Sequence, residues 1–274
     1  MSGAGEAFRA LHDAPELFVT PNPWDIGSAR ILAAMGFKAL ATTSAGMAYG
    51  LGVCEGEVTR PQQIEHLRLL VDATPLPVSA DLEKGFGDTP DSVAETIRVV
   101  SETGLAGGSI EDFTGNLSAP IFDIGLAAER IAAAAEACRH LPEDFVLTAR
   151  AEGLCYGHTD LNEIITRLQA YEAAGADVLY APGLSDLASI RMVCEAVSKP
   201  VNVVMGMPGT TFSIEELAQA GVKRVSVGSA FFRVAYGAMI ASAREIVEEG
   251  AFTQTQDGIG FAEIETFFER SPTR

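Results

Sequence analysis

The sequence predicts an α/β fold of the (β/α)₈ type, the TIM barrel, and three observations support this prediction. Short β-branched or apolar segments alternate about eight times with longer amphipathic, alanine-rich segments. The chain has 274 residues, 47% of them hydrophobic, which is the size that one such barrel fills. A glycine-containing turn precedes four of the strand-like segments, in MGFKAL, ETGLAGG, AAGADV and QAGVKRV. Eight such units favour a closed barrel over an open sheet.

The individual elements follow from the same periodicity. The expected strands span residues 17–20, 38–43, 77–81, 106–110, 145–149, 177–180, 200–204 and 223–227. The expected helices span residues 25–35, 60–74, 90–103, 125–140, 159–174, 185–197, 213–220 and 229–249. Helix N-caps are expected at Asp25, Thr89, Thr159 and Ser213, and the glycines that end helices at Gly36, Gly104, Gly175 and Gly221.

No proline-rich, serine-rich or charged linker divides the chain. We therefore predict that residues 1–274 form a single (β/α)₈-barrel domain. Residues 250–274 are expected to be a C-terminal helical extension that packs outside the barrel or on a neighbouring subunit, because FAEIETFFER has an amphipathic helical pattern.

The charge and composition of the chain argue against several classes of binding partner. The net charge of −18 makes nucleic acid and anionic membranes unlikely partners, since both require a basic surface. The chain has no apolar run of 18 residues and no signal-peptide pattern at its start, so we expect a cytoplasmic protein that does not cross a membrane. Its four cysteines lack metal-binding or disulfide spacing and are expected to be reduced thiols.

Acidic residues follow the third and fourth predicted strands. Asp81, Glu83 and Glu111 would lie at the rim formed by the C-terminal ends of the strands, where barrel enzymes carry their active sites. Three carboxylates placed together would repel one another without a cation, and oxygen ligands suit Mg²⁺ or Mn²⁺. In the alternative interpretation, Asp81 and Glu111 cap loops and pair with Lys84 or Arg150.

Other residues at the same rim are candidates for binding an anionic substrate. Ser44, Ala45 and Gly46 form a predicted small-residue turn whose N–H groups could hold a carboxylate, although a plain tight turn is equally compatible. Arg150 could grip a carboxylate through two hydrogen bonds, or pair with Glu152 or Glu111. Trp24 is a candidate wall of the site or a core residue. Asn202 would face the barrel lumen or bond to a neighbouring loop.

Five segments together resemble the isocitrate lyase and phosphoenolpyruvate mutase superfamily, from about Leu17 to about Glu248. They are PNPWDIGSARILAAMGFKALATTSAG, VSADLEKGFGD, GSIEDFTG, LTARAEG and PVNVVMGMPG. The resemblance implies a (β/α)₈ barrel, Mg²⁺ and a small 2-oxo or 2-hydroxy carboxylic acid substrate. It also implies a homotetramer, a dimer of dimers, in which the eighth helix is exchanged between subunits.

The resemblance also implies roles for individual residues. Asp81 and Glu111 match acidic positions of the metal site, and Arg150 matches the substrate-binding arginine. Ser44 and Ala45 match a backbone clamp for carboxylate, as substrate-binding positions. Glu55 lies close to the place of a further acid, after a one-residue gap, and together with Arg150 and Glu111 forms the predicted catalytic set.

The sequence departs from the family pattern at its gate loop. Family lyases carry a Lys-Lys/Arg-Cys-Gly-His loop after the Glu-Asp pair, whereas this chain reads EDFTGNLSAP, and residues 113–124 contain no cysteine, lysine or arginine. Ser79 stands where a further metal-site acid would be, and Glu83 follows in a longer loop.

Three functions are compatible with this pattern. The favoured one is a Mg²⁺-dependent lyase that cleaves a C–C bond of a 2-oxo or 2-hydroxy acid by decarboxylation or retro-aldol chemistry, because family decarboxylases of oxaloacetate also lack the gate cysteine. The alternatives are a mutase or hydrolase acting on the P–C bond of phosphonopyruvate-like substrates, and a catalytically weak barrel that binds metabolites.

Overall fold

The computed structural model describes residues 3–207, 209 and 211–270, and within them the chain forms an eight-stranded parallel sheet that curves into a nearly closed barrel. The strands are β1 (Phe18–Thr20), β2 (Leu40–Ala41), β3 (Val78–Asp81), β4 (Gly107–Glu111), β5 (Val146–Arg150), β6 (Val178–Tyr180), β7 (Val201–Val204) and β8 (Arg224–Ser226). They pair in the order β1-β8-β7-β6-β5-β4-β3-β2. Each lies within the predicted strand or extends it by one residue, and the predicted (β/α)₈ fold is confirmed.

Asn22 completes the barrel between β1, β2 and β8. Its side-chain amide donates to the carbonyl of Thr42 at 2.8 Å, and its Oδ1 accepts the N–H groups of Val227 and Gly228 at 2.8 and 2.9 Å. The N–H of Ala41 also donates to the carbonyl of Pro21 at 3.1 Å. One buried amide thus satisfies backbone groups where the strands are too short to pair fully.

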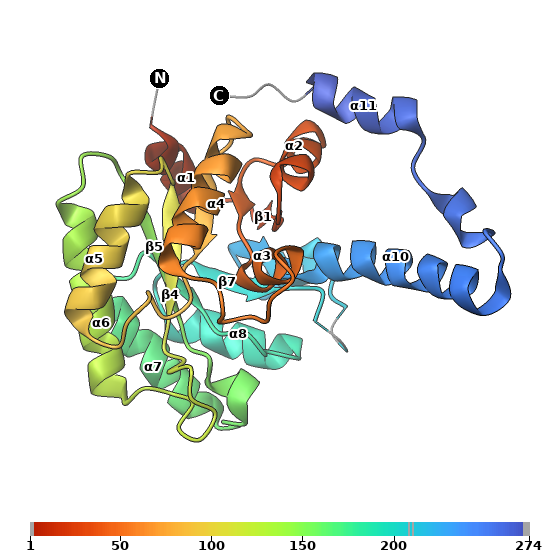
Figure 1. The fold of residues 1–274 in the computed structure, drawn as a ribbon. Coiled ribbons are helices and arrows are strands. Elements are labelled where there is room, and N and C mark those ends of the chain that lie inside the picture. Colours follow the sequence, from red (N-terminus) through yellow and green to blue (C-terminus); the bar gives the residue numbers. More distant parts are fainter. Residues whose placement is uncertain (1–2, 208, 210, 271–274) are drawn as a thin grey trace.

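Helices surround the barrel (Figure 1). Eight correspond to the predicted ones within the described residues: α2 (Ile26–Ala34), α4 (Arg60–Asp72), α5 (Pro90–Ser101), α6 (Ile124–Arg139), α7 (Leu161–Ala173), α8 (Leu187–Ala196), α9 (Ile214–Gln219) and α10 (Ala230–Glu249). Additional helices are α1 (Ala4–Asp13), α3 (Ser44–Gly50), α11 (Phe261–Arg270) and the short 3₁₀ turns η1 (Gly153–Tyr156) and η2 (Gln254–Asp257).

Most predicted helix ends are confirmed by their hydrogen bonds. Asp25, Thr89 and Ser213 accept backbone N–H groups as N-caps, and the four predicted glycines have φ between 82° and 104°, which permits the turn back to the next strand. The prediction for Thr159 was wrong: Asp160 caps α7, because its carboxylate accepts the N–H of Asn162 at 2.9 Å.

The small-residue segment from Ser44 to Gly46 is the first turn of α3, and its prediction as a plain turn was wrong. Thr43 begins the helix by accepting the N–H of Gly46 at 3.2 Å. A local side-chain bond therefore outweighs the low helix propensity of the two glycines in SAGMAYG.

The N-terminal helix α1 closes the barrel at the end opposite the predicted functional rim. Phe8 is fully buried and packs in one apolar cluster, which consists of Phe18, Ala39, Ala106, Val146 and Val178. Arg9 fastens the helix through Asp144 at 2.7 Å and Asp177 at 2.8 Å. The sequence analysis did not predict this helix, although its buried face and the capping bond from the N–H of Gly3 to Glu6 are local features.

The C-terminal part of the chain leaves the barrel. Figure 1 shows α10 running outward and the following segment turning back, so that α11 lies near α2. Arg30 of α2 lies over the ring of Phe268 at 5.3 Å. The predicted extension 250–274 therefore contains a helix, while its residues 271–274 lie outside the described part. Among the described helices, none is both long and apolar enough to cross a membrane.

We predict that Phe8→Ala lowers the free energy of unfolding by about 3–5 kcal/mol, because it leaves a cavity at the closed end of the barrel. Urea unfolding followed by circular dichroism measures this loss. The nearly volume-conserving Phe8→Leu should cost less than about 1.5 kcal/mol. Equal losses in the two variants would show that packing of the ring does not stabilise this end.

Candidate active site

A cavity of about 420 Å³ opens at the C-terminal ends of the strands. Its lining includes most of the predicted site residues, namely Ser44, Ala45, Glu55, Asp81, Glu83, Glu111, Arg150 and Asn202. Trp24 and Gly46 are not among the described residues that line it. The fold therefore brings side chains from the ends of β2, β3, β4, β5 and β7 to one space, as parallel strands in a barrel require.

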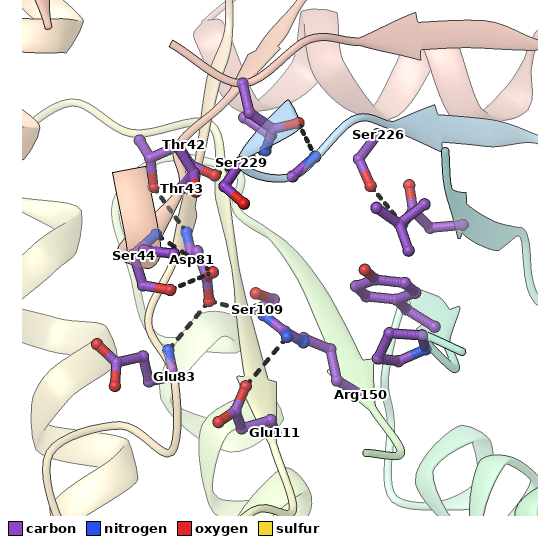
Figure 2. Close-up of a pocket in the computed structure, with 18 of the residues that line it drawn as sticks. Thr42, Thr43, Ser44, Asp81, Glu83, Ser109, Glu111, Arg150, Ser226 and Ser229 are labelled. Carbon is purple, nitrogen blue, oxygen red and sulfur yellow. Dashed lines mark hydrogen bonds and ion pairs between the residues drawn. The ribbon is translucent and has the colours of Figure 1, made fainter. Parts of the chain in front are cut away.

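Arg150 lies at the centre of the acidic residues. Its guanidinium contacts Asp81 Oδ1 at 2.7 Å, Glu111 Oε2 at 3.2 Å and Glu152 Oε1 at 2.8 Å. Burial alone would lower the pKa of Arg150, but the three carboxylates raise it well above its ordinary value. The ion pairs expected in the alternative interpretation are thus present, and Figure 2 shows Asp81 and Glu111 pointing toward Arg150.

The carboxylates outnumber this one cation. Burial raises the pKa of Glu111 well above its ordinary value, and the nearby acids Glu152, Asp81 and Glu83 raise it further. Burial followed by repulsion from Asp81 raises the pKa of Glu55. Burial, repulsion from Asp81 and repulsion from Glu55 raise the pKa of Glu83 to about 7. This end of the cavity therefore favours the binding of a proton or another cation.

Glu83 has a backbone conformation that is rare for a residue with a side chain. Its φ is 49°, in the left-handed region, and backbone hydrogen bonds hold it on both sides. Its N–H donates to Asp81 Oδ1 at 3.3 Å, and its carbonyl accepts the N–H of Glu111 at 3.0 Å. Such a conformation persists only where the surroundings impose it, and it recurs at functional sites.

The predicted metal triad of Asp81, Glu83 and Glu111 is not assembled for coordination. In the described part of the chain, no three acidic, histidine or cysteine side chains are spaced to hold one metal ion. The physical reason is visible in Figure 2: Arg150 bonds to both Asp81 and Glu111, whereas the carboxylate of Glu83 points away from it. The donor chemistry nevertheless fits a hard divalent cation, because crowded carboxylates supply oxygen ligands and excess negative charge.

Ser44 binds carboxylates of the protein itself. Its hydroxyl lies 2.9 Å from Asp81 Oδ2 and 3.0 Å from Glu55 Oε1, and its N–H donates to Asp81 Oδ2 at 3.4 Å. Since the N–H of Gly46 donates to Thr43, two of the three N–H groups predicted to hold a substrate carboxylate already have partners. That prediction needs correction, because α3 uses these groups to order its own start.

Trp24 and Asn202 were predicted as substrate-binding residues with alternatives. The ring of Trp24 packs edge-on against Phe232 of α10, with centroids 5.6 Å apart, and neither residue is among the described lining of the cavity. Asn202 faces the barrel lumen, where it donates to Ser226 Oγ at 3.0 Å and accepts from Arg224 Nε at 2.8 Å. Of the two predicted alternatives, the structure has the lumen position, and the substrate-binding role of Asn202 stays a prediction.

The whole arrangement matches a known family. A family profile described as phosphoenolpyruvate phosphomutase matches residues 8–247. The chain belongs to this family, within the isocitrate lyase and phosphoenolpyruvate mutase superfamily.

Three similar proteins show which members of the superfamily this chain resembles. A solved structure of a candidate lyase/mutase from Burkholderia cenocepacia J2315 is 52% identical, with a TM-score of 0.95 and 98% of each chain covered. The 2-methylisocitrate lyase of Escherichia coli K12 is 30% identical over 228 residues, covering 80% of this chain and 76% of that protein. Oxaloacetate acetylhydrolase with bound oxalate is 27% identical, with a TM-score of 0.85 and coverages of 96% and 93%.

The loop after β4, where family lyases carry their gate cysteine, is held in place by internal hydrogen bonds. Thr114 donates its N–H to the carbonyl of Pro120 at 2.7 Å, and Phe113 forms an antiparallel bridge with Ile121. Lys84 donates to the carbonyl of Thr114 at 2.7 Å. Backbone N–H and carbonyl groups of this loop are thus bonded to other protein groups, whereas in a mobile loop they would bond to water.

Residues of the neighbouring loop after β5 also line the cavity, and the sequence analysis did not predict them. Tyr156 stacks on Phe113, with ring centroids 4.2 Å apart, and thereby connects the loops after β4 and β5. Cys155 lines the cavity, and burial, followed by Glu152, raises its pKa to about 12. Its thiol is therefore protonated at neutral pH. The sequence feature that could have identified both residues is their position just after the segment RAEG, at the end of a predicted strand.

A buried network behind the cavity positions the ends of β4 and β5. Asp112 accepts the hydroxyl of Tyr171 at 2.6 Å and the N–H of Glu152 at 2.7 Å, and pairs with Arg167 at 3.3 Å. Arg130 donates to the carbonyl of Glu111 at 3.0 Å. The sequence analysis did not predict this network because its arginines lie on the helices α6 and α7, and an arginine on a helix is normally exposed to solvent.

We predict that Asp112→Asn lowers the free energy of unfolding by about 1–3 kcal/mol, because it removes a buried hydrogen-bonded carboxylate and leaves Arg167 with Glu163 as its remaining carboxylate partner. Urea unfolding measures the loss. Tyr171→Phe, which removes one hydrogen bond to the same carboxylate, should cost about 1.5–3 kcal/mol. A loss below about 1 kcal/mol for Asp112→Asn would contradict the network's role.

Proposed function

We propose that the protein is a Mg²⁺-dependent lyase that cleaves a C–C bond of a small 2-oxo or 2-hydroxy carboxylic acid. The observation that carries this proposal is the group of carboxylates at the rim of the cavity, which exceeds the charge of Arg150. The functions of two relatives, 2-methylisocitrate lyase and oxaloacetate acetylhydrolase, support C–C chemistry.

The cation would be held by Asp81 and Glu111, with Glu83 joining after a rotation of its side chain. Bound there, Mg²⁺ or Mn²⁺ would neutralise the negative charge that develops on the substrate's oxygen as the C–C bond breaks. If Asp81 and Glu111 turned from Arg150 to the cation, two of the three carboxylate contacts of Arg150 would be broken. The guanidinium could then orient the substrate by charge-assisted hydrogen bonds. Glu55 and Ser44 would keep Asp81 in position from the opposite side.

P–C chemistry on a phosphonopyruvate-like substrate is the second candidate and ranks lower. A transferring phosphoryl group is stabilised by several cations. The loop segment 113–124 contains no lysine or arginine, and the basic residues among the described lining are Arg150 and Arg224. This composition favours a carboxylate as the substrate's charged group.

We expect the purified protein with Mg²⁺ to release pyruvate or glyoxylate from at least one of oxaloacetate, 2-methylisocitrate and isocitrate, and to lose this activity with a chelator. Phosphonopyruvate serves as the P–C comparison, followed through phosphate or pyruvate. Turnover of phosphonopyruvate alone would favour the second candidate. No turnover of any substrate, with tight Mg²⁺-dependent oxalate binding, would identify a metabolite-binding barrel.

We further predict that Asp81→Asn and Glu111→Gln each weaken Mg²⁺-dependent binding of oxalate by about 100-fold or more, since even indirect support of a metal site contributes 10- to 100-fold. Isothermal titration calorimetry measures the binding. Asp88→Asn is the matched control, because this carboxylate is 63% exposed and pairs with Lys84 instead of Arg150. Unchanged affinity in both site variants would rule out this metal site.

The projecting α10 supports a second proposal, that two copies of the chain exchange this helix in a homo-oligomer, a dimer of dimers. Large apolar side chains are exposed along α10 and the segment after it, namely Phe231, Val234, Met239, Ile240, Val247, Phe252, Ile259 and Phe261. Exposed apolar side chains gathered on one projecting segment indicate a protein partner. A second copy suits it, because the same helix from each subunit can cover the other in a two-fold interface.

We predict that the double substitution Val234→Asp with Met239→Asp reduces the particle mass to that of a smaller assembly, because it places charges in the interface. Multi-angle light scattering after size exclusion measures the mass. Met192→Asp on α8 is the matched control, since Met192 is exposed to a similar degree as Met239 but lies on another helix. A monomeric wild-type protein would contradict the proposal.

A further inference from the structure

The cavity contains a second arginine whose situation is opposite to that of Arg150. Arg224, at the start of β8, lines the cavity and is only 5% exposed. Whereas Arg150 has three carboxylate partners, no ion pair is formed by Arg224 with any described residue. The barrel thus holds one guanidinium that its own carboxylates neutralise and one that they do not.

The partners of Arg224 are all neutral. Its Nε donates to Asn202 Oδ1 at 2.8 Å and one terminal nitrogen donates to Thr148 Oγ1 at 3.1 Å, while the other lies 3.4 Å from Nε2 of His12. Burial, followed by the charge of Arg224, lowers the pKa of His12 to about 3, so His12 carries no charge at neutral pH. Burial lowers the pKa of Arg224 to about 10, and its guanidinium stays charged.

The space around Arg224 suits an anion. Hydroxyl side chains of the strands and of the residues that follow them line the same cavity as Arg224, namely Thr20, Thr42, Ser79, Ser109 and Ser226. Barrel lumens are more often filled by bulky, branched apolar residues. Small polar side chains leave room and supply hydrogen-bond donors. On the far side, Arg224 lies 5.8 Å from the ring of Phe8, which closes the lumen below it.

A buried charge without a counter-ion is costly, and an anion that reaches it gains a charge-assisted hydrogen bond. We propose that Arg224 binds a second carboxylate of the substrate, at the inner end of the cavity. The substrate's first carboxylate and its 2-oxygen lie at the rim near Asp81. This inference rests on the proposed lyase function and makes the substrate a dicarboxylic acid. Arg224 is then the residue that distinguishes dicarboxylates from monocarboxylates.

Lactate and malate test the proposal, because both are 2-hydroxy acids and malate has the additional carboxylate. Calorimetry with Mg²⁺ should show that the wild-type protein binds malate about 10- to 100-fold more tightly than lactate, the range of one or two charged hydrogen bonds. Arg224→Gln should abolish this preference and leave the affinities for lactate and oxalate within about two-fold of wild type.

Asn202→Asp provides a second variant that keeps the arginine. The new carboxylate would lie beside Arg224 Nε, neutralise it and reduce the affinity for malate to that for lactate. Asn202→Ser, which removes the amide without adding charge, is its control and should retain a preference for malate. Circular dichroism establishes that each variant is folded.

The outcomes separate this inference from the proposed function. A wild-type protein without preference for malate, or a preference that survives both Arg224→Gln and Asn202→Asp, would overturn the role of Arg224. If oxalate binding does not require Mg²⁺ while the malate preference still depends on Arg224, the metal-dependent function is wrong and the carboxylate site stands.

Discussion

The buried guanidinium of Arg150 joins the ends of three strands at the centre of the cavity. Asp81 from β3, Glu111 from β4 and Glu152 beyond β5 all contact it, and each is buried enough that loss of this cation would leave an uncompensated charge. Around this core the acids still exceed the positive charge, which is why the pKa values of Glu55, Glu83 and Glu111 are raised. Arg150 is thus the counter-ion of these carboxylates, and the excess negative charge around it favours the binding of a further cation.

The barrel separates two kinds of electrostatic environment along its axis. The outer rim has excess negative charge, while the lumen below it has the unneutralised positive charge of Arg224 among hydroxyl groups. Asn202 lies beside Arg224 in the register of β7 and β8 and bonds to it, whereas the helix α1 seals the inner end through Phe8. A ligand with a metal-binding head and an anionic tail matches this axial order.

The sequence predicted the barrel and most of the residues at its rim because both depend on local patterns. Hydrophobic period and glycine turns place each strand, and the strand ends then identify Asp81, Glu111 and Arg150. What the sequence could not predict are contacts between distant segments. The pairing of Arg150 with all three acids, the Asp112 network through Arg167 and Tyr171, and the role of Phe8 each require the closed barrel. The turn predicted at Ser44 failed because one threonine side chain starts a helix there.

The loop after β4 has a consequence for the timing of catalysis. In enzymes whose active sites close over the substrate, the opening of a lid often sets the turnover rate. Here Thr114, Phe113 and Lys84 fasten the loop, and the stack of Phe113 on Tyr156 connects it to the neighbouring loop. For the proposed lyase, a loop fastened in this way would let ligands exchange without a loop opening, so that bond cleavage or product dissociation would set the turnover rate. The reaction would then proceed in contact with solvent, which favours intermediates that tolerate water.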